Sequence, residues 1–323
     1  MPKKIEISHR TIIFTVFFLL LLWVLFQVRE TILMLFVSII LMSAFNPAVD
    51  LLGKLHLPRG IAILIVYIFV WTAVGLIVAG IVPALVDQTN RLIHLIPSAI
   101  SKVELFNTNQ QAITQQLLSQ IGTLPENLLR LTVGLFGNLL AVLTTLVMTF
   151  YLLLERKHLN NYISTIWEGD KSARISKTVN EIERRLGSWV RGELVLMLAV
   201  GTLTYIGLSI LGVEIALPLA ILAGILEIVP NIGPTISAVP AALVALTIHP
   251  LTALATVALY FLVQLVENNL LVPKIMQKAV GVNPLVSIVG LMIGFRLAGP
   301  AGAVLAIPII IVVHIIGLEY FKS

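Results

Sequence analysis

The chain contains no cysteine, and only 11% of its residues are charged. The absence of cysteine excludes disulfide bonds, thiolate metal sites and thiol nucleophiles, and it leaves the redox compartment undetermined. The scarcity of charge accompanies a hydrophobic content of 58% and a mean hydropathy of +1.02. A soluble protein of 323 residues could not cover that much apolar surface. We therefore predict an all-α polytopic membrane protein.

Common catalytic motifs are also missing. The sequence has no G-x-x-x-x-G-K-[ST] loop, so we do not expect ATP hydrolysis by a P-loop. It has no H-E-x-x-H, G-x-S-x-G or paired-histidine arrangement, and its six histidines are scattered. We predict a protein that is not an enzyme and that carries no cofactor and no metal.

Long apolar runs dominate what is present. We predict six full spans, over residues 11–28, 31–45, 60–82, 131–154, 193–211 and 251–271. The first run follows basic residues, as a signal peptide does. It is too long for that role and lacks a small-residue cleavage site, so we interpret it as a retained span.

Two further apolar stretches, 215–248 and 284–318, carry the same pattern of breaks. Pro218 and Gly233-Pro234 in the first correspond, at a constant offset, to Pro284 and Gly299-Pro300 in the second. Each break leaves a helix of about 14 residues, roughly 21 Å long, which is too short for a hydrocarbon core of about 30 Å. Paired, interrupted segments of this kind indicate a transporter's binding site. The alternative is two kinked spanning helices, because Gly and Pro are common in membrane helices.

The distribution of Lys and Arg predicts the orientation. With a cytoplasmic N-terminus and two re-entrant hairpins, most basic residues lie inside, including all those from Arg156 to Arg191. The C-terminus is then also cytoplasmic, and the hairpins enter from opposite faces as an inverted pair. We predict a multi-pass protein of the inner (cytoplasmic) membrane. The net charge of +5 is thus a topology signal, and we expect no nucleic-acid partner.

Charges beside the two breaks are the first candidates for a site. Glu227 precedes Gly233-Pro234, and Arg296 precedes Gly299-Pro300. If the hairpin tips meet, a carboxylate and a guanidinium converge as a gate or as a coupled proton and substrate site. The alternatives are a structural ion pair, or two side chains that reach separate interfaces.

A second polar group lies within the span 251–271. Gln264, Glu267 and Asn269 interrupt an otherwise aliphatic helix, so they must face protein or water. They form either a functional site or helix–helix hydrogen bonds. Asn231, at the first break, offers a further oxygen ligand.

The stretch from Lys171 to Val190 has apolar residues at helical spacing, with charges on the other face. This pattern predicts either an amphipathic helix on the cytoplasmic membrane surface or a connector packed against the bundle.

Three motifs resemble the autoinducer-2 exporter family of bacterial and archaeal membrane proteins. They are Asn46-Pro47-x-Val49-Asp50 with Leu57-Pro58-Arg59-Gly60; Glu227-Ile228-Val229-Pro230-Asn231-Ile232-Gly233-Pro234; and Gln264-x-x-Glu267-x-Asn269 with Pro273-Lys274-Ile275 and the residues that follow. The resemblance implies a multi-span transporter that forms a homo-oligomer. Some members resemble exporters of autoinducer-2, and others sodium or lithium/proton antiporters. Where the family usually has Gln, this chain has Glu193, so a role for that position is in doubt.

These observations together predict three parts: a membrane scaffold over 1–155 with a polar extracytoplasmic segment at 87–130, a connector over 156–191, and a transport unit over 192–323. We expect a secondary transporter that exports a small polar solute by alternating access around the hairpins. The alternatives are a sodium (lithium)/proton antiporter and a non-transporting scaffold. We expect the lipid bilayer and further copies of the chain as partners. The predicted substrate or ion pathway comprises Glu227, Asn231, Gly233, Pro234, Gln264, Glu267, Asn269, Arg296, Gly299 and Pro300.

Overall fold

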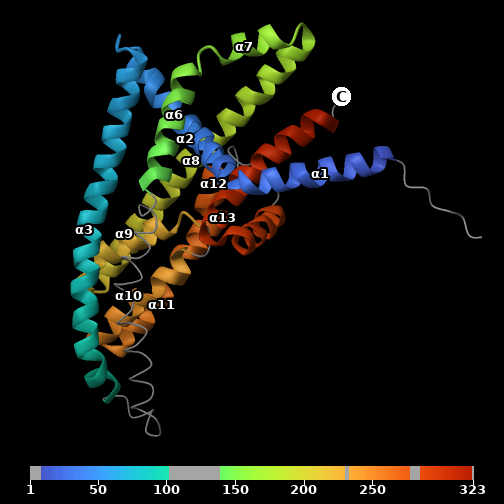
Figure 1. Ribbon diagram of the computed structural model, residues 1–323. Helices are drawn as coiled ribbons and strands as arrows, with labels where there is room; N and C mark the ends of the chain where they lie inside the picture. Colours follow the sequence, from blue (N-terminus) through green and yellow to red (C-terminus); the bar gives the residue numbers. More distant parts are fainter. Residues whose placement is uncertain (1–8, 102–138, 230–232, 277–283, 322–323) are drawn as a thin grey trace, which may run out of the picture.

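The computed structural model describes residues 9–101, 139–229, 233–276 and 284–321 (Figure 1). Within these ranges all regular structure is helical, which confirms the predicted all-α class. In chain order the helices are α1 (His9–Gln27), α2 (Arg29–Gly53), α3 (Arg59–Ser101), α6 (Leu139–Glu155), α7 (Leu159–Ile166), α8 (Asp170–Ile210), α9 (Ala216–Leu226), α10 (Gly233–Ile248), α11 (Pro250–Val266), the π-helical turn η2 (Glu267–Leu271), α12 (Val272–Met276) and α13 (Pro284–Phe321).

Six of the described helical segments are long and apolar enough to cross a membrane, which identifies a multi-pass membrane protein. They are α1, α2, Arg59–Gly80 of α3, α8, Pro250–Met276 and Leu285–Glu319. This set differs from the prediction in two places. The predicted span 131–154 corresponds to α6, which is described from Leu139 onward. A bend of 74° separates α6 from α7. The last segment qualifies by length, although its backbone is broken inside.

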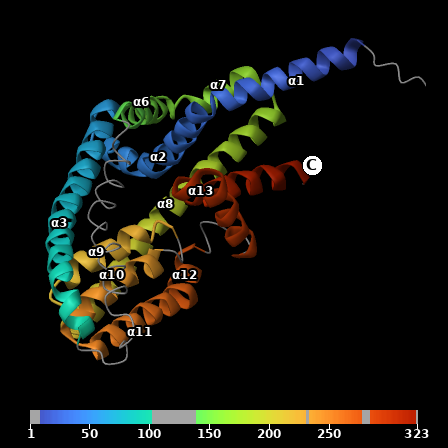
Figure 2. The ribbon, with the colours of Figure 1, turned by 60° about the horizontal axis from the view of Figure 1, so that its bottom comes forward.

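The longest helix of the C-terminal half, α8, has 41 residues and is about 60 Å long. It joins residues 170–191 of the predicted connector to the predicted span 193–211 in one continuous helix, whereas the connector begins with α7. Ile182, Leu186 and Trp189 pack with Ile40 of α2 and Ile311 of α13. Of the two interpretations of this stretch, the structure therefore shows packing against the bundle. Helices α2, α9, α11 and α13 all contact α8, which places it at the centre of the molecule (Figure 2).

Both Gly-Pro breaks reverse the direction of the chain. At the first, α10 folds back on α9, and a Cβ on Gly233 would overlap the Leu226 carbonyl. At the second, Gly299 has φ 61° and ψ −147°, a conformation that favours glycine. There Gly294 and Gly302 approach so closely that a Cβ on either would overlap the other's carbonyl. Both apolar stretches are thus helical hairpins; their entry from opposite membrane faces stays a prediction.

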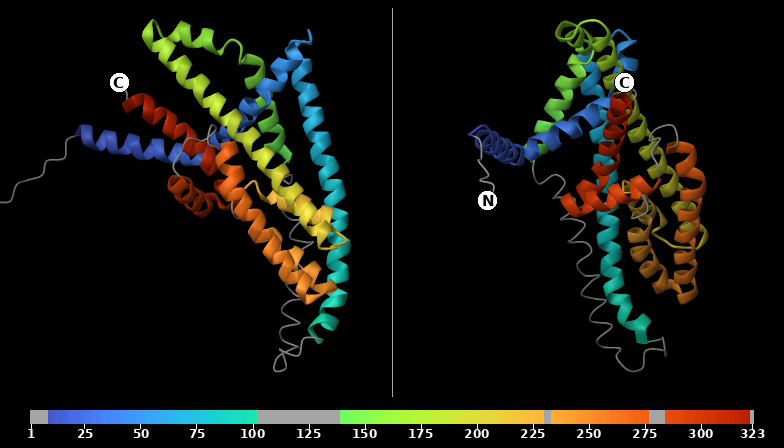
Figure 3. Two further views of the ribbon diagram at one scale, coloured as in Figure 1. Left: turned by 180° about the vertical axis from the view of Figure 1, so that it is seen from behind. Right: turned by 90° about the vertical axis from the view of Figure 1, so that its right-hand side faces the viewer.

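Large apolar side chains cover much of the outer surface, as lipid contact requires. Helix α1 is the extreme case, because none of its residues is buried. It extends away from the rest of the molecule and contacts α2 (Figure 3). In contrast, α9, α10 and α11 share a packed apolar core with the end of α8, which includes Leu208, Leu219 and Tyr260.

Candidate functional site

Three glutamates from separate elements meet inside the C-terminal half. Glu193 belongs to α8, Glu227 caps the C-terminal end of α9, and Glu267 begins η2. Their residues are 3%, 0% and 0% exposed, and each of the three pairs lies within electrostatic range. We call this group the glutamate cluster. Two of its members were predicted from the sequence, and the structure brings them together with a third.

Local structure explains how each carboxyl group is positioned. Glu193 lies on the buried face of α8 with Leu196 and Val200, at helical spacing. Glu227 ends α9, six residues before Gly233 of the first break. Glu267 starts a π-helical turn, an uncommon conformation that occurs frequently at functional sites. The π turn therefore marks the predicted Gln264–Asn269 region as structurally specialised.

None of the six carboxyl oxygens has a hydrogen-bond partner among the described residues. An ionised carboxylate in such a place costs several kcal/mol, because desolvation is not offset by a partner. Each group therefore needs a proton, a cation or water. Over the described part of the chain, no group of three or more His, Cys, Asp or Glu side chains has the geometry to hold a metal ion. The chemistry best matched to this arrangement is the uptake and release of protons.

The other predicted residues occupy varied positions. Gly233 and Pro234 are buried at the start of α10, next to Glu227 along the hairpin. Gln264 is half-buried on α11, whereas Asn269 is exposed and donates a hydrogen bond to the Leu265 carbonyl (2.8 Å). Asn231 lies outside the described residues, as do 102–138 of the predicted polar segment.

The predicted meeting of Glu227 with Arg296 is not present. Glu227 is fully buried beside Glu267 and has no donor among the described residues, whereas Arg296 is exposed on the first arm of α13 with Pro300 beyond the turn. The physical reason is the packing of the hairpins: the first packs on α8 and α11, whereas α13 packs on α8 and α2. Arg296, Gly299 and Pro300 thus belong to a second hairpin, apart from the cluster in this conformation.

Glu193 is the member that the sequence did not single out. It stands at the edge of an apolar run, where a charge is usually interfacial. The available signal was its helical register with Leu196, Val200 and Leu208, which form the buried face of α8. The sequence left the role of Glu193 in doubt because it does not show that two further acidic groups lie close to this residue.

Comparison with known proteins identifies the family of the chain. A sequence profile described as "AI-2E family transporter" matches residues 12–322. The chain belongs to this family. YueF of Bacillus subtilis is 28% identical over 295 residues, which cover 85% of this chain and 80% of YueF. TqsA of Escherichia coli K12, an AI-2 transport protein, is 29% identical over 299 residues, or 88% of this chain and 83% of TqsA. The resemblance found in the motifs is thus confirmed, and the chain is a membrane transporter by family.

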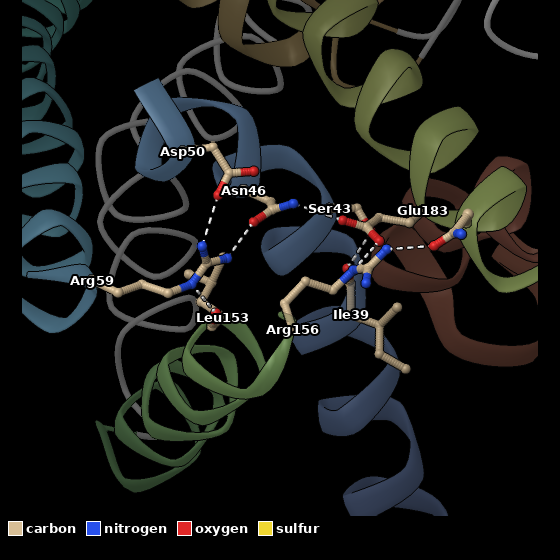
Figure 4. A network of polar contacts seen from close by, with 9 residues as sticks. Ile39, Ser43, Asn46, Asp50, Arg59, Leu153, Arg156 and Glu183 are labelled. Carbon is tan, nitrogen blue, oxygen red and sulfur yellow. Dashed lines mark hydrogen bonds and ion pairs between the residues drawn. The ribbon is translucent and has the colours of Figure 1, made fainter. Parts of the chain in front are cut away.

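A second polar site of this AI-2E family transporter lies around Glu183, about 15 Å nearer the N-terminal end of α8 than Glu193 (Figure 4). Arg59 of α3 donates to Asp50 Oδ1, to Asn46 Oδ1 and to the Leu153 carbonyl, each at 2.7 Å. The Asn46 and Leu57-Pro58-Arg59 motifs are thus joined by one guanidinium, whose planar fork suits several acceptors at once.

The same network continues to α8. Asn46 donates to Glu183 Oε1 at 2.9 Å, and the other oxygen of Glu183 pairs with Arg156. Arg156 also donates to Asn180 Oδ1 at 2.6 Å. We call the residues of this site the arginine network; it connects α2, α3 and α8 with the end of α6 and with the residue that follows it. Its charged groups are all paired, which indicates a structural role.

Proposed function

We propose that this chain is a secondary transporter that exports a small polar solute in exchange for protons, which bind at the glutamate cluster. The observation that carries this proposal is the burial of three neighbouring carboxyl groups that no donor among the described residues satisfies. Acidic side chains inside membrane proteins are costly and mark ion pathways or proton relays. The relative TqsA is named as an AI-2 transport protein, and this name supports an autoinducer-2-like solute for the present chain.

The position of the cluster supports coupling by alternating access. Glu227 belongs to the α9–α10 hairpin, whereas Glu193 and Glu267 belong to α8 and to the extension of α11. Any displacement of the hairpin changes the separation of Glu227 from the other two carboxyl groups. Because like charges at short range disfavour ionisation, such movement changes how tightly protons are held. Proton binding and hairpin position are then thermodynamically linked.

A sodium (lithium)/proton antiporter is the second candidate, because the same carboxylates supply oxygen ligands for a hard cation. In a scaffold without transport activity, three buried carboxyl groups would lower stability and serve no transport step.

The test uses the purified protein in liposomes that contain a pH-sensitive dye. We expect an imposed proton gradient to drive labelled autoinducer-2 transport, and Glu227→Gln or Glu267→Gln to abolish it. Glu168→Gln is the matched control, because Glu168 is exposed before α8. Proton movement driven by sodium or lithium alone would replace the proposal with the antiporter. No flux under any gradient would leave the scaffold.

The proposal includes a homo-oligomer in the cytoplasmic membrane with both termini inside. The fully exposed α1 supports the first part, since a second copy or lipid must cover its apolar surface. Cross-linking in native membranes would show the number of copies. A monomer would contradict this part of the proposal alone.

A further inference from the structure

Three hydroxyl groups on the buried faces of α8 and α11 have no hydrogen-bond partner among the described residues. They belong to Thr204, Thr256 and Tyr260, whose residues are 0%, 0% and 3% exposed. Buried hydroxyl groups are normally paired, so each unpaired one calls for an explanation such as an ordered water.

Other helical threonines of this protein show how unusual this is. Thr145, Thr149, Thr178 and Thr202 each donate to the carbonyl four residues earlier, at 2.7–3.0 Å. Such back-bonding is the usual solution for threonine inside a helix. Thr204 and Thr256 do not adopt it, and their hydroxyl groups therefore stay available for another partner.

The unpaired groups are aligned with the glutamate cluster. On α8, Thr204 lies about three turns beyond Glu193 on the same face, roughly 16 Å along the axis. On α11, Thr256 and Tyr260 share the buried face with Val263, and Glu267 follows it. The buried faces of both helices thus carry unpaired hydroxyl groups as well as members of the glutamate cluster.

The packing of α8 on α11 fixes the order of these levels. Gly207 lies against Leu259, and Gly192 lies against Met276, so the helices run antiparallel. Thr204 then falls between the levels of Glu267 and Tyr260. Thr256 lies nearest the end of α8, close to where α11 begins at Pro250. From the cluster outward, the order is Thr204, Tyr260, Thr256.

Neighbouring residues isolate this column on its sides. The Tyr260 ring packs in an apolar core with Leu208, Leu222 and Ala241. Ser237 of α10 lies beside Tyr260 and donates to the Pro234 carbonyl at 3.1 Å. A hydroxyl group both donates and accepts, so a column of hydroxyl groups and waters can pass protons along.

We propose that Thr204, Tyr260 and Thr256 form the path by which protons move between the glutamate cluster and the end of the bundle where α8 ends and α11 begins. By the basic-residue count, this end is extracytoplasmic. The inference rests on the proposed function, in which the cluster binds protons. It adds the route, and it assigns one side of the membrane as the source of those protons.

The test measures proton access directly, without a solute. The full-length protein in lipid is transferred to D₂O, and infrared spectroscopy follows the hydrogen–deuterium exchange of the protonated carboxyl band that Glu267→Gln removes. We expect Tyr260→Phe and Thr204→Val to slow this exchange at least tenfold. Thr202→Val is the matched control, because its hydroxyl is back-bonded and exposed on the same helix.

Each outcome decides one question. Exchange at the wild-type rate in both Tyr260→Phe and Thr204→Val would overturn the path while leaving the proposed function intact. The absence of any carboxyl band that Glu267→Gln removes would instead refute proton binding at the cluster. Tyr260→Phe removes a hydroxyl group, and Thr204→Val replaces one with a methyl group of similar size. Thr256→Val provides a third variant if one of these fails to fold.

Discussion

The arginine network and the glutamate cluster each include a carboxyl group of α8, and these two carboxyl groups differ in their hydrogen-bond partners. Around Glu183, both carboxylate oxygens have partners, Asn46 and Arg156. Around Glu193, about 15 Å further along α8, neither oxygen has one within the described structure. Paired groups stabilise a single arrangement, whereas unpaired buried acids store an energetic cost that a bound proton relieves. The difference separates a structural site from a candidate ion site.

The largest expected effect comes from Glu267→Gln. It should lower proton-coupled transport at least a hundredfold, because the amide cannot take up and release a proton. It should not lower the thermal unfolding midpoint, since no donor among the described residues pairs with the Glu267 carboxyl group and the amide removes a like-charged neighbour of Glu227. Transport and unfolding are measured on the same preparation. A midpoint that falls by several degrees would show that the cluster is structural after all.

Arg59→Ala should have the opposite profile. It leaves Asp50, Asn46 and the Leu153 carbonyl without their donor, so we expect a loss of about 1–3 kcal/mol in the free energy of unfolding. The partial exposure of Asp50 limits the effect. Denaturant titration in detergent provides the measurement, with Arg59→Lys expected to recover only part of the loss. Unchanged stability would remove the distinction between the two sites.

Glu183→Gln should lower the free energy of unfolding by less, about 1 kcal/mol. The amide keeps an oxygen acceptor but loses the charge that pairs with Arg156. The same titration measures this loss, and transport per folded molecule should stay at the wild-type level. A selective loss of transport would instead make the arginine network part of the mechanism.

Glu181→Gln should have the smallest effect, below about 0.5 kcal/mol. Its partners are the exposed Arg184 and the half-buried Arg185, and water reaches these ion pairs more than it reaches the Arg156–Glu183 pair. High salt should mimic the substitution in wild-type protein. If Glu181→Gln lowered the free energy of unfolding more than Glu183→Gln does, the exposure of an ion pair on α8 would not predict its contribution to stability.

Sequence patterns predicted much of the fold and part of the site. Apolar runs identified the spans, and the Gly-Pro repeats located both hairpins, because these features act locally on the backbone. Glu227 and Glu267 were selected for their charge in an apolar context. Glu193 was missed and Arg296 misplaced, since the first depends on which face of α8 is buried and the second on which helices each hairpin contacts.

By itself, then, the sequence determined the membrane class, the family, the turns at Gly233 and Gly299 and the identity of two buried acids. These follow from hydrophobicity and from local backbone preferences, which act over a few residues. Only the tertiary structure decided that three acids share one site, that α8 is continuous and that hydroxyl groups of α8 and α11 are buried without partners among the described residues. Those facts depend on the register between helices far apart in the chain, which side-chain packing selects and no single segment encodes.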